Sequence, residues 1–346
     1  MKSAVTSWLT AIMTSFLFVS SGTAGPVEDF YRGKQIALIV PSGVGGGYDL
    51  YSRFLARYLG KHIPGSPSVV VKNMPGAGGI AAANYIYSIA PADGLTIGSF
   101  QNTITLNQLA KMPSVKFDVR KFGWIGNMSI ASTICAFSGG ARNLGVNDLL
   151  SQEVLIGATF GSPSLIPSIL NSLAGTHFKI VQGYVSTSNV LIAMESGEVN
   201  GLCGWSWDGA RVNAQDMLSR GVAKVAVDIA IQPQPELQKL GVPFLMDSLP
   251  AGEKKDVLNV ILSTQVYNRP FGVPPGVPED RLQALRTAFE LTMRDTEVRA
   301  EAEKLGLDLQ YLAPEKIVSL LGLALDAPVG IQERAIEELR KAGFGG

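Results

Sequence analysis

The sequence predicts an α/β protein built from two sheet-containing units. Short runs rich in β-branched residues alternate with helical patterns in the first third of the chain, and a second alternating series follows. The 346 residues are 46% hydrophobic, which is enough for two separate cores. The 29 basic and 29 acidic residues balance and form no basic run, which argues against nucleic acid as a partner.

The order of elements in the first series is typical of a parallel sheet. Strands are expected at 35–41, 68–73 and 96–100, with a helix at 49–61 after the first strand and another after the loop at 75–79. This βαβαβ order predicts parallel strands with helices on the faces of the sheet.

The second series and the last third complete the prediction. Strands are expected at 154–160, 177–184, 197–205 and 222–227, helices at 188–196 and 208–220, a further strand within 262–278, and helical stretches near 278–292, 294–305 and 314–341. Linkers between tandem domains tend to be rich in Pro, Gly and polar residues. The chain has no such linker between the two series, which fits lobes joined by strands that cross directly from one to the other.

The N-terminus has the pattern of a secretory signal peptide over residues 1–24. Lys2 precedes an apolar run at 8–19 that is too short to span a bilayer. Gly22 and Ala24 are small residues at the expected spacing before a cleavage site after Ala24. We expect an exported protein; a retained N-terminal membrane anchor is the alternative.

The cysteines and histidines are few. Cys135 and Cys203 are the only cysteines, and we expect two buried, unbridged residues inside strands, although an oxidising compartment would permit a bridge. His62 and His177 are the only histidines. Without CxxC spacing or a histidine cluster, no metal site and no cofactor are expected.

A glycine-rich loop, PSGVGGG at 41–47, separates the first strand from its helix. The sequence matches a dinucleotide fingerprint only weakly, because its third glycine position is Tyr48 and no acidic residue follows the second strand. A phosphate-binding Walker loop needs a lysine that is absent here. Ser42 has no nucleophile-elbow motif around it, and neither histidine is placed beside it by the sequence.

Anion capture by backbone amides is the remaining interpretation. Glycines 45 to 47 expose N–H groups at a helix N-terminus, where the dipole favours negative charge. PGAGG at 75–79 repeats the arrangement after the next strand, and both loops should lie at the carboxyl edge of the sheet. Neither loop contains a basic side chain. We therefore expect a carboxylate held by backbone alone, with Asp49 as the helix N-cap; loops that only make tight turns are the alternative.

These loops carry a family resemblance. IALIVPSGVGGGYDLYSRFLARYLGK at 36–61 and VVVKNMPGAGGIAAANYIYSIAPADGLTIGS at 69–99 closely resemble the periplasmic solute-binding proteins of tripartite tricarboxylate transporters, the Bug family. Looser matches occur at 161–164, 194–201 and 271–285. The resemblance implies a monomeric, non-catalytic periplasmic receptor that binds a small organic acid and delivers it to a permease with a large and a small subunit. A ligand sensor for a signalling partner is the second hypothesis, and an enzyme the third.

The fold implied by the resemblance is the type II periplasmic binding-protein fold, with two doubly wound α/β lobes and a ligand cleft between them. Lobe one is expected to comprise residues 25–130 plus 228–346, and lobe two residues 131–227. The motifs point to Ser42, Gly46 and Gly47 in the first loop, Gly76, Ala77 and Gly79 in the second, and Gly161, Ser162 and Ser164 in lobe two. Their neighbours Gly43, Tyr48, Gly78, Asn102, Thr103 and Trp205 are added as candidate ligand contacts.

The chain departs from the family pattern at two places. Leu165 stands where the family often has histidine, and Gly204 and Trp205 stand where it often has Asp-Asn, which can meet a ligand amine. The resemblance therefore favours an acid with a flat or apolar body over an amino acid. That body would lie against Trp205 or Trp207; the alternative is that both tryptophans belong to the core.

Overall fold

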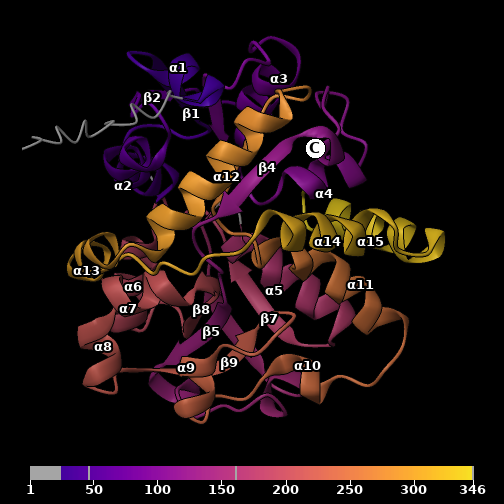
Figure 1. Cartoon of the computed structure of the whole chain (residues 1–346). Coiled ribbons are helices and arrows are strands. Elements are labelled where there is room, and N and C mark those ends of the chain that lie inside the picture. The colour runs from indigo at the N-terminus through magenta and orange to yellow at the C-terminus, as the bar shows by residue number, and fades with distance from the viewer. Residues whose placement is uncertain (1–24, 46, 160–161, 345–346) are drawn as a thin grey trace, which may run out of the picture.

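The computed structural model describes residues 25–45, 47–159 and 162–344. The predicted signal peptide, Gly46 and Gly161 lie outside the described residues. The chain forms two lobes, each built around a five-stranded sheet (Figure 1). The α/β prediction is therefore confirmed. No helix in the described part of the chain is both long and apolar enough to cross a membrane.

The sheet of the first lobe has the order β2-β1-β3-β10-β4. Its strands are β1 (Gln35–Val40), β2 (Ser68–Asn73), β3 (Thr96–Ser99), β4 (Gly123–Asn127) and β10 (Pro270–Val273). Strand β1 pairs in parallel with β2 and β3, while β10 runs antiparallel between β3 and β4. The three predicted N-terminal strands are confirmed. The strand predicted within 262–278 is only the four residues of β10.

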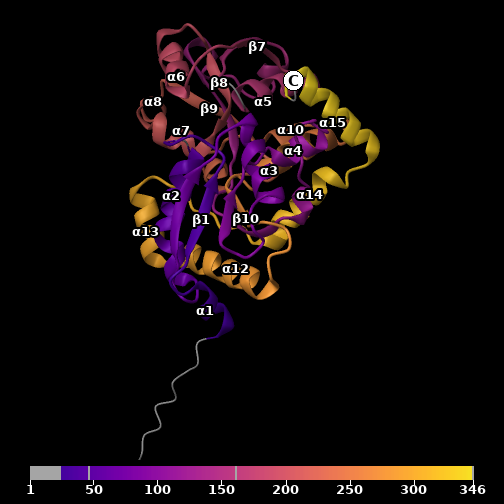
Figure 2. The same cartoon turned by 90° about the horizontal axis from the view of Figure 1, so that it is seen from above.

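Helices cover both faces of this sheet. They are α1 (Pro26–Tyr31), α2 (Gly47–His62), α3 (Ile80–Ser88), α4 (Ile104–Leu109), α12 (Glu279–Arg294), α13 (Thr296–Lys304) and α14 (Pro314–Leu325). Because side chains alternate along a strand, Leu38 packs with Phe54 of α2 and Phe289 of α12, whereas Ile39 packs with α3 and α14 on the opposite face. Figure 2 shows α2 and α12 beside β1 and β10.

The sheet of the second lobe has the order β7-β6-β8-β5-β9. Its strands are β5 (Thr133–Ser138), β6 (Glu153–Gly157), β7 (His177–Val181), β8 (Gly201–Ser206) and β9 (Ala223–Ile229). Its helices are α5 (Ser162–Leu173), α6 (Thr187–Ser196), α7 (Trp207–Asn213), α8 (Gln215–Ser219), α9 (Pro235–Lys239), α10 (Leu245–Ser248), α11 (Glu253–Leu262) and α15 (Val329–Lys341). The helix expected over 314–341 is two helices, because Pro328 precedes the start of α15.

Two chain segments cross between the lobes beside each other, at 128–132 and within 230–269, and the chain crosses a third time between α14 and α15. The first two run side by side where they cross: Asn268 donates its backbone N–H to the carbonyl of Ser129, and Met128 donates to the carbonyl of Arg269, both at 3.0 Å. Backbone hydrogen bonds therefore join these two crossings into a two-stranded connection between the lobes.

The second crossing and the C-terminus differ from the lobe boundaries expected from the sequence. Leu258 of α11 and Leu339 of α15 belong to the same buried cluster as Val154 and Phe178 of the second sheet. Part of the range 228–346 thus packs with lobe two, since the apolar faces of these helices meet the second sheet. Figure 1 shows α14 and α15 at the level where the lobes meet.

The two cysteines are bridged, which corrects the expectation of unpaired residues. Cys135 on β5 lies opposite Cys203 on the antiparallel strand β8, and the two form a disulfide. Sequence separation gave no sign of this pairing, because only the register of β5 against β8 brings the residues together.

Candidate functional site

Three loops meet at the carboxyl edge of the first sheet, as expected for the ends of parallel strands. They are residues 41–45 after β1, 74–79 after β2 and 100–103 after β3. Asn73, the last residue of β2, donates its Nδ2 hydrogens to the Ser42 carbonyl at 2.9 Å and to Asp49 Oδ1 at 2.8 Å. The first two loops are therefore tied together by one amide side chain.

Gly79 joins the second loop to the other two. Its φ of +92° is in the left-handed region, and a Cβ placed on it would lie 2.5 Å from Gln101 Cγ and 3.3 Å from Pro41 Cβ. Any larger residue would push the loops apart. The close contact between three loops from different strands thus depends on a glycine.

Asp49 is a structural residue, but it is not the helix N-cap that the sequence predicted. It is the third residue of α2, 2% exposed, and accepts a hydrogen bond from the backbone N–H of Gly45 at 2.8 Å. Arg53 Nε donates to the same oxygen at 2.9 Å. Hydrogen bonding to Arg53, and then to Gly45 and Asn73, lowers the pKa of Asp49 to about 2.

Tyr48 connects the first loop to the third. Its hydroxyl accepts from the backbone N–H of Asn102 at 3.1 Å and donates to Asn102 Oδ1 at 3.4 Å. Burial raises the pKa of Tyr48, so the hydroxyl stays protonated. Thr103 follows Asn102 and caps α4 without a side-chain hydrogen bond. The structure thus brings the predicted residues of lobe one to a single edge: Ser42, Gly43, Gly47, Tyr48, Gly76, Ala77, Gly78, Gly79, Asn102 and Thr103.

Of the predicted residues of lobe two, Ser162 and Ser164 lie at the start of α5. Ser164 Oγ accepts a hydrogen bond from Gln182 at 3.3 Å. A Cβ on Gly204, whose φ is +78°, would collide with the backbone of Ser162 and Pro163. The glycine that departs from the family pattern therefore has a packing reason, because β8 passes directly against the start of α5.

The structure places both tryptophans of lobe two in a core cluster. Trp205 is 4% exposed and Trp207 is 7% exposed, and both pack with Val190 and Leu202. Trp207 Nε1 donates to Glu236 Oε2 at 2.7 Å. This favours the core alternative for Trp205, and its predicted contact with a ligand has no support in this placement.

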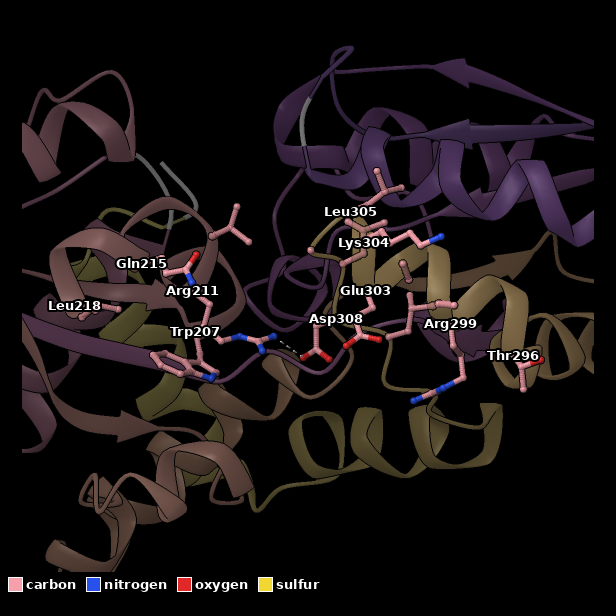
Figure 3. Close-up of a pocket in the computed structure, with 16 residues that line it drawn as sticks. Trp207, Arg211, Gln215, Leu218, Thr296, Arg299, Glu303, Lys304, Leu305 and Asp308 are labelled. Atoms are coloured by element: carbon pink, nitrogen blue, oxygen red, sulfur yellow. Dashed lines mark ion pairs between the residues drawn. The ribbon is translucent and has the colours of Figure 1, made fainter. Parts of the chain in front are cut away.

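A hollow of about 1200 Å³ lies between the lobes (Figure 3). Helices α7 and α8 of lobe two form one wall, and α13 with residues 305–309 of lobe one forms the other. Arg211 points across it toward Asp308, with 4.0 Å between Nη2 and Oδ2. Asp308 in turn donates its backbone N–H to the Tyr51 hydroxyl at 3.1 Å, so this wall is connected to α2.

Arg269 is the site residue that sequence reasoning missed. It precedes β10 in the second crossing, and its Nη2 lies 3.0 Å from the position that a Cβ on Gly47 would occupy. Its guanidinium carbon lies 4.3 Å from the centre of the Tyr48 ring and 5.2 Å from that of Tyr51. No sequence motif connects an arginine in the last third of the chain with the glycine loop. The two come together because β10 lies beside β3 in the sheet.

Unpartnered polar atoms gather at the same edge. Within the described residues, the buried atoms without a hydrogen-bond partner include Ser42 Oγ, Ser99 Oγ, Ser129 Oγ, Asn268 Nδ2 and Arg269 Nε. They come from the ends of β1, β3 and β4 and from the start of β10. Buried polar groups in proteins are almost always paired. An edge with several free donors and acceptors is suited to a polar ligand and its bridging waters.

Solved structures of other proteins share this architecture. A solute-binding protein of the TctC type from Polaromonas has a TM-score of 0.67 and 17% identity, over 90% of this chain and 99% of the other. The structure described as "R. palustris Rpa4515 with adipate" has a TM-score of 0.60 and 18% identity, over 90% and 97%. The chain has the periplasmic solute-binding protein fold. The predicted two-lobed α/β fold of this type is confirmed.

The sequence relationship is more local. The protein BugT of Bordetella pertussis is 37% identical over 113 residues, which are 32% of this chain and 33% of that relative. The match therefore spans about a third of the curated relative. No family model matches the chain. Together with the fold, this match confirms the resemblance to the Bug family.

In this solute-binding protein fold, the site and the crossings are continuous. Arg269 stands in the second crossing, one residue before β10, and its carbonyl is bonded to the first crossing at Met128. A ligand held by Arg269 and the glycine loops would contact both lobe one and the crossings that connect it to lobe two.

Proposed function

We propose that this protein is a periplasmic receptor that captures a small organic acid and delivers it to a membrane permease of the tripartite tricarboxylate type. The observation that carries the proposal is the meeting of two glycine loops at the carboxyl edge of the first sheet, tied by Asn73 and spaced by Gly79. Backbone N–H groups at a helix N-terminus favour a carboxylate. The adipate bound by a structurally similar protein supports the same ligand class.

Binding follows from the two-lobed architecture. The acid first engages the loops of lobe one, and rotation about the paired crossings brings the start of α5, with Ser162 and Ser164, toward it. Ligand shifts this equilibrium to the extent that it binds the closed form more tightly than the open form. The permease would then recognise the closed receptor, which is how binding is converted into delivery.

Export belongs to the same proposal. The signal-peptide pattern over residues 1–24 supports cleavage after Ala24 and a periplasmic location. The disulfide between Cys135 and Cys203 is of the kind that persists in an oxidising compartment. A sensor function would use the same cleft, and it would be favoured by a neighbouring sensor-kinase gene in place of permease genes.

The test is a thermal-shift screen of the mature protein against mono-, di- and tricarboxylates, including adipate. A ligand that binds only the folded state raises the free energy of unfolding by about 2.7 kcal/mol at a concentration of 100 times its Kd. We expect at least one acid to raise the melting temperature and to be recovered unchanged. Chemical conversion of the bound acid would indicate an enzyme, and the lack of any shift across the screen would contradict the receptor.

A further inference from the structure

Arg269 presents a positive charge that no acidic side chain neutralises. Within residues 25–45, 47–159 and 162–344, no carboxylate lies within 4.0 Å of its guanidinium nitrogens. Its Nη1 bonds only to neutral oxygens, the carbonyl and Oδ1 of Asn268, at 2.9 and 2.7 Å. Its Nε is buried without a partner. The charge is thus half-buried and has unused donors.

The nearest element adds more positive charge. Arg269 Nη2 lies beside Gly47, the first residue of the 16-residue helix α2, whose N-terminal N–H groups carry the positive end of the dipole. Asp49 is the acidic residue nearest to Gly47 in the sequence. Both of its carboxylate oxygens already accept hydrogen bonds, from Gly45, Arg53 and Asn73. A guanidinium and a helix N-terminus side by side repel each other unless an anion lies between them.

Asn268 is a second, independent indication of a ligand. The residue is 6% exposed, its Oδ1 is held by Arg269, and its Nδ2 has no partner within the described residues. The amide hydrogens therefore remain buried and unpaired next to the guanidinium. A buried donor without a hydrogen bond lowers the stability of the folded protein. An acceptor oxygen of a ligand at this place would satisfy it.

We propose that a carboxylate of the ligand binds between Arg269 and the N-terminus of α2, so that a side-chain cation, and not the backbone alone, holds its charge. This inference rests on the proposed receptor function and names the residue that selects an acid over its neutral analogues. It replaces the expectation from the sequence, which found no basic side chain in either glycine loop and assigned the whole charge to backbone amides.

The two tyrosines position the guanidinium for this task. Arg269 lies over the rings of Tyr48 and Tyr51, and such cation–π contacts hold the planar group by its face. The edge, with Nε and Nη2, stays available for two parallel hydrogen bonds to a carboxylate. The ammonium group of lysine is not planar and cannot donate two parallel hydrogen bonds to one carboxylate. Lysine should therefore replace Arg269 poorly.

The chain offers a matched control. Arg57 also lies over two aromatic rings, those of Phe54 and Tyr58, at 5.3 and 5.4 Å, but on the exposed side of α2. The experiment compares the wild type with Arg269→Gln, Arg269→Lys and Arg57→Gln. Melting temperatures are measured in sodium acetate against sodium chloride at equal ionic strength, and the acids that bind the wild type are titrated calorimetrically into each variant.

We expect acetate to stabilise the wild type and Arg57→Gln but not Arg269→Gln. Affinity for the acid should fall on the order of ten- to hundred-fold in Arg269→Gln, as for a lost hydrogen-bonded charge, and Arg269→Lys should recover only part of it. Without ligand, Arg269→Gln should melt no lower than the wild type, because the repulsion is gone. If the variants fail to fold, the side-chain Nε–H resonances of ¹⁵N-arginine-labelled wild type decide the matter, since acetate should shift one of them.

The outcomes separate this inference from the receptor function. If an acid binds the wild type and Arg269→Gln equally well, the receptor stands and this site is wrong. If acetate acts through Arg269 but no acid larger than acetate binds, the anion site stands and the receptor for a larger organic acid is wrong. If acetate neither stabilises the wild type nor shifts an arginine resonance, the anion site is overturned.

Discussion

Arg211 of α7 and Asp308 of the segment after α13 face each other across the two lobes, with 4.0 Å between Nη2 and Oδ2 (Figure 3). Arg211 also bonds Glu236 at 3.2 Å within its own lobe. The pair with Asp308 is therefore an ion pair that only the present lobe arrangement permits. It should affect the hinge equilibrium more than the stability of either lobe.

We predict that Arg211→Ala shifts the ligand-free protein toward more open conformations. The free energy of unfolding should fall by less than about 1 kcal/mol, because partly exposed ion pairs contribute little. Small-angle scattering should show a larger radius of gyration than for the wild type. Arg220→Ala is the control, since Arg220 pairs with Asp216 and Glu195 inside lobe two. Equal radii for all three proteins would contradict a role for the pair between the lobes.

The second glycine loop allows a test of backbone access. Gly78 has a φ of +60°, and a Cβ placed there would meet no atom within 4 Å. We expect Gly78→Val to fold with a loss of roughly 1–2 kcal/mol from left-handed strain and to lose measurable binding of the acid. Gly78→Asn, which tolerates this φ, should retain more binding. Lys72→Ala should bind like the wild type, since Lys72 is exposed, as expected from the sequence. Calorimetric titration with circular dichroism as the folding check decides between these outcomes.

The low pKa of Asp49 predicts how the free energy of unfolding changes at acidic pH. Its pKa is about 2 in the folded protein, against an ordinary value of 3.8. A depressed pKa stabilises the fold above the unfolded-state value, and that contribution is lost as the pH falls from about 4 toward 2. Asp49→Asn should therefore be less stable than the wild type at pH 7, and the difference should shrink across this window. Urea titrations at several pH values measure it, with the exposed Asp29→Asn as control. A constant difference at all pH values would count against the assignment.

The disulfide predicts a large stability difference. It closes a segment of 68 residues, for which the loop-closure model predicts about 4 kcal/mol of stabilisation. The double variant Cys135→Ala/Cys203→Ala should unfold at lower denaturant, while the wild type isolated from the periplasm should contain no thiol that reacts with a labelling reagent after unfolding. Two reactive thiols in that protein would show that the bridge does not form.

Export predicts the mature N-terminus. Mass spectrometry of the protein from the periplasm of its native host should find a chain that begins near Gly25, since Gly22 and Ala24 have the small side chains that signal peptidase requires. Intact Met1 on most molecules would favour the membrane anchor instead.

Periodicity and local motifs were enough for much of the fold. The first three strands and the helix after each glycine loop follow from hydrophobic spacing and turn residues, which act within one element. The position of both loops at one edge follows as well, because parallel strands place their carboxyl ends together. Asp49 shows the limit of such local reasoning: a helix-start preference suggested a cap, while the side chain instead reaches back to Gly45 from inside the helix.

What the sequence by itself determined is therefore the set of elements and the chemistry of the first loops. The tertiary structure alone decided three other features: the bridge between Cys135 and Cys203, the packing of α11 and α15 on lobe two, and the position of Arg269 beside Gly47. Each depends on which strands and helices become neighbours after the chain has crossed between the lobes. Strand order and register are settled by the packing of whole faces, and a single sequence read along its length carries no local signal for such long-range contacts.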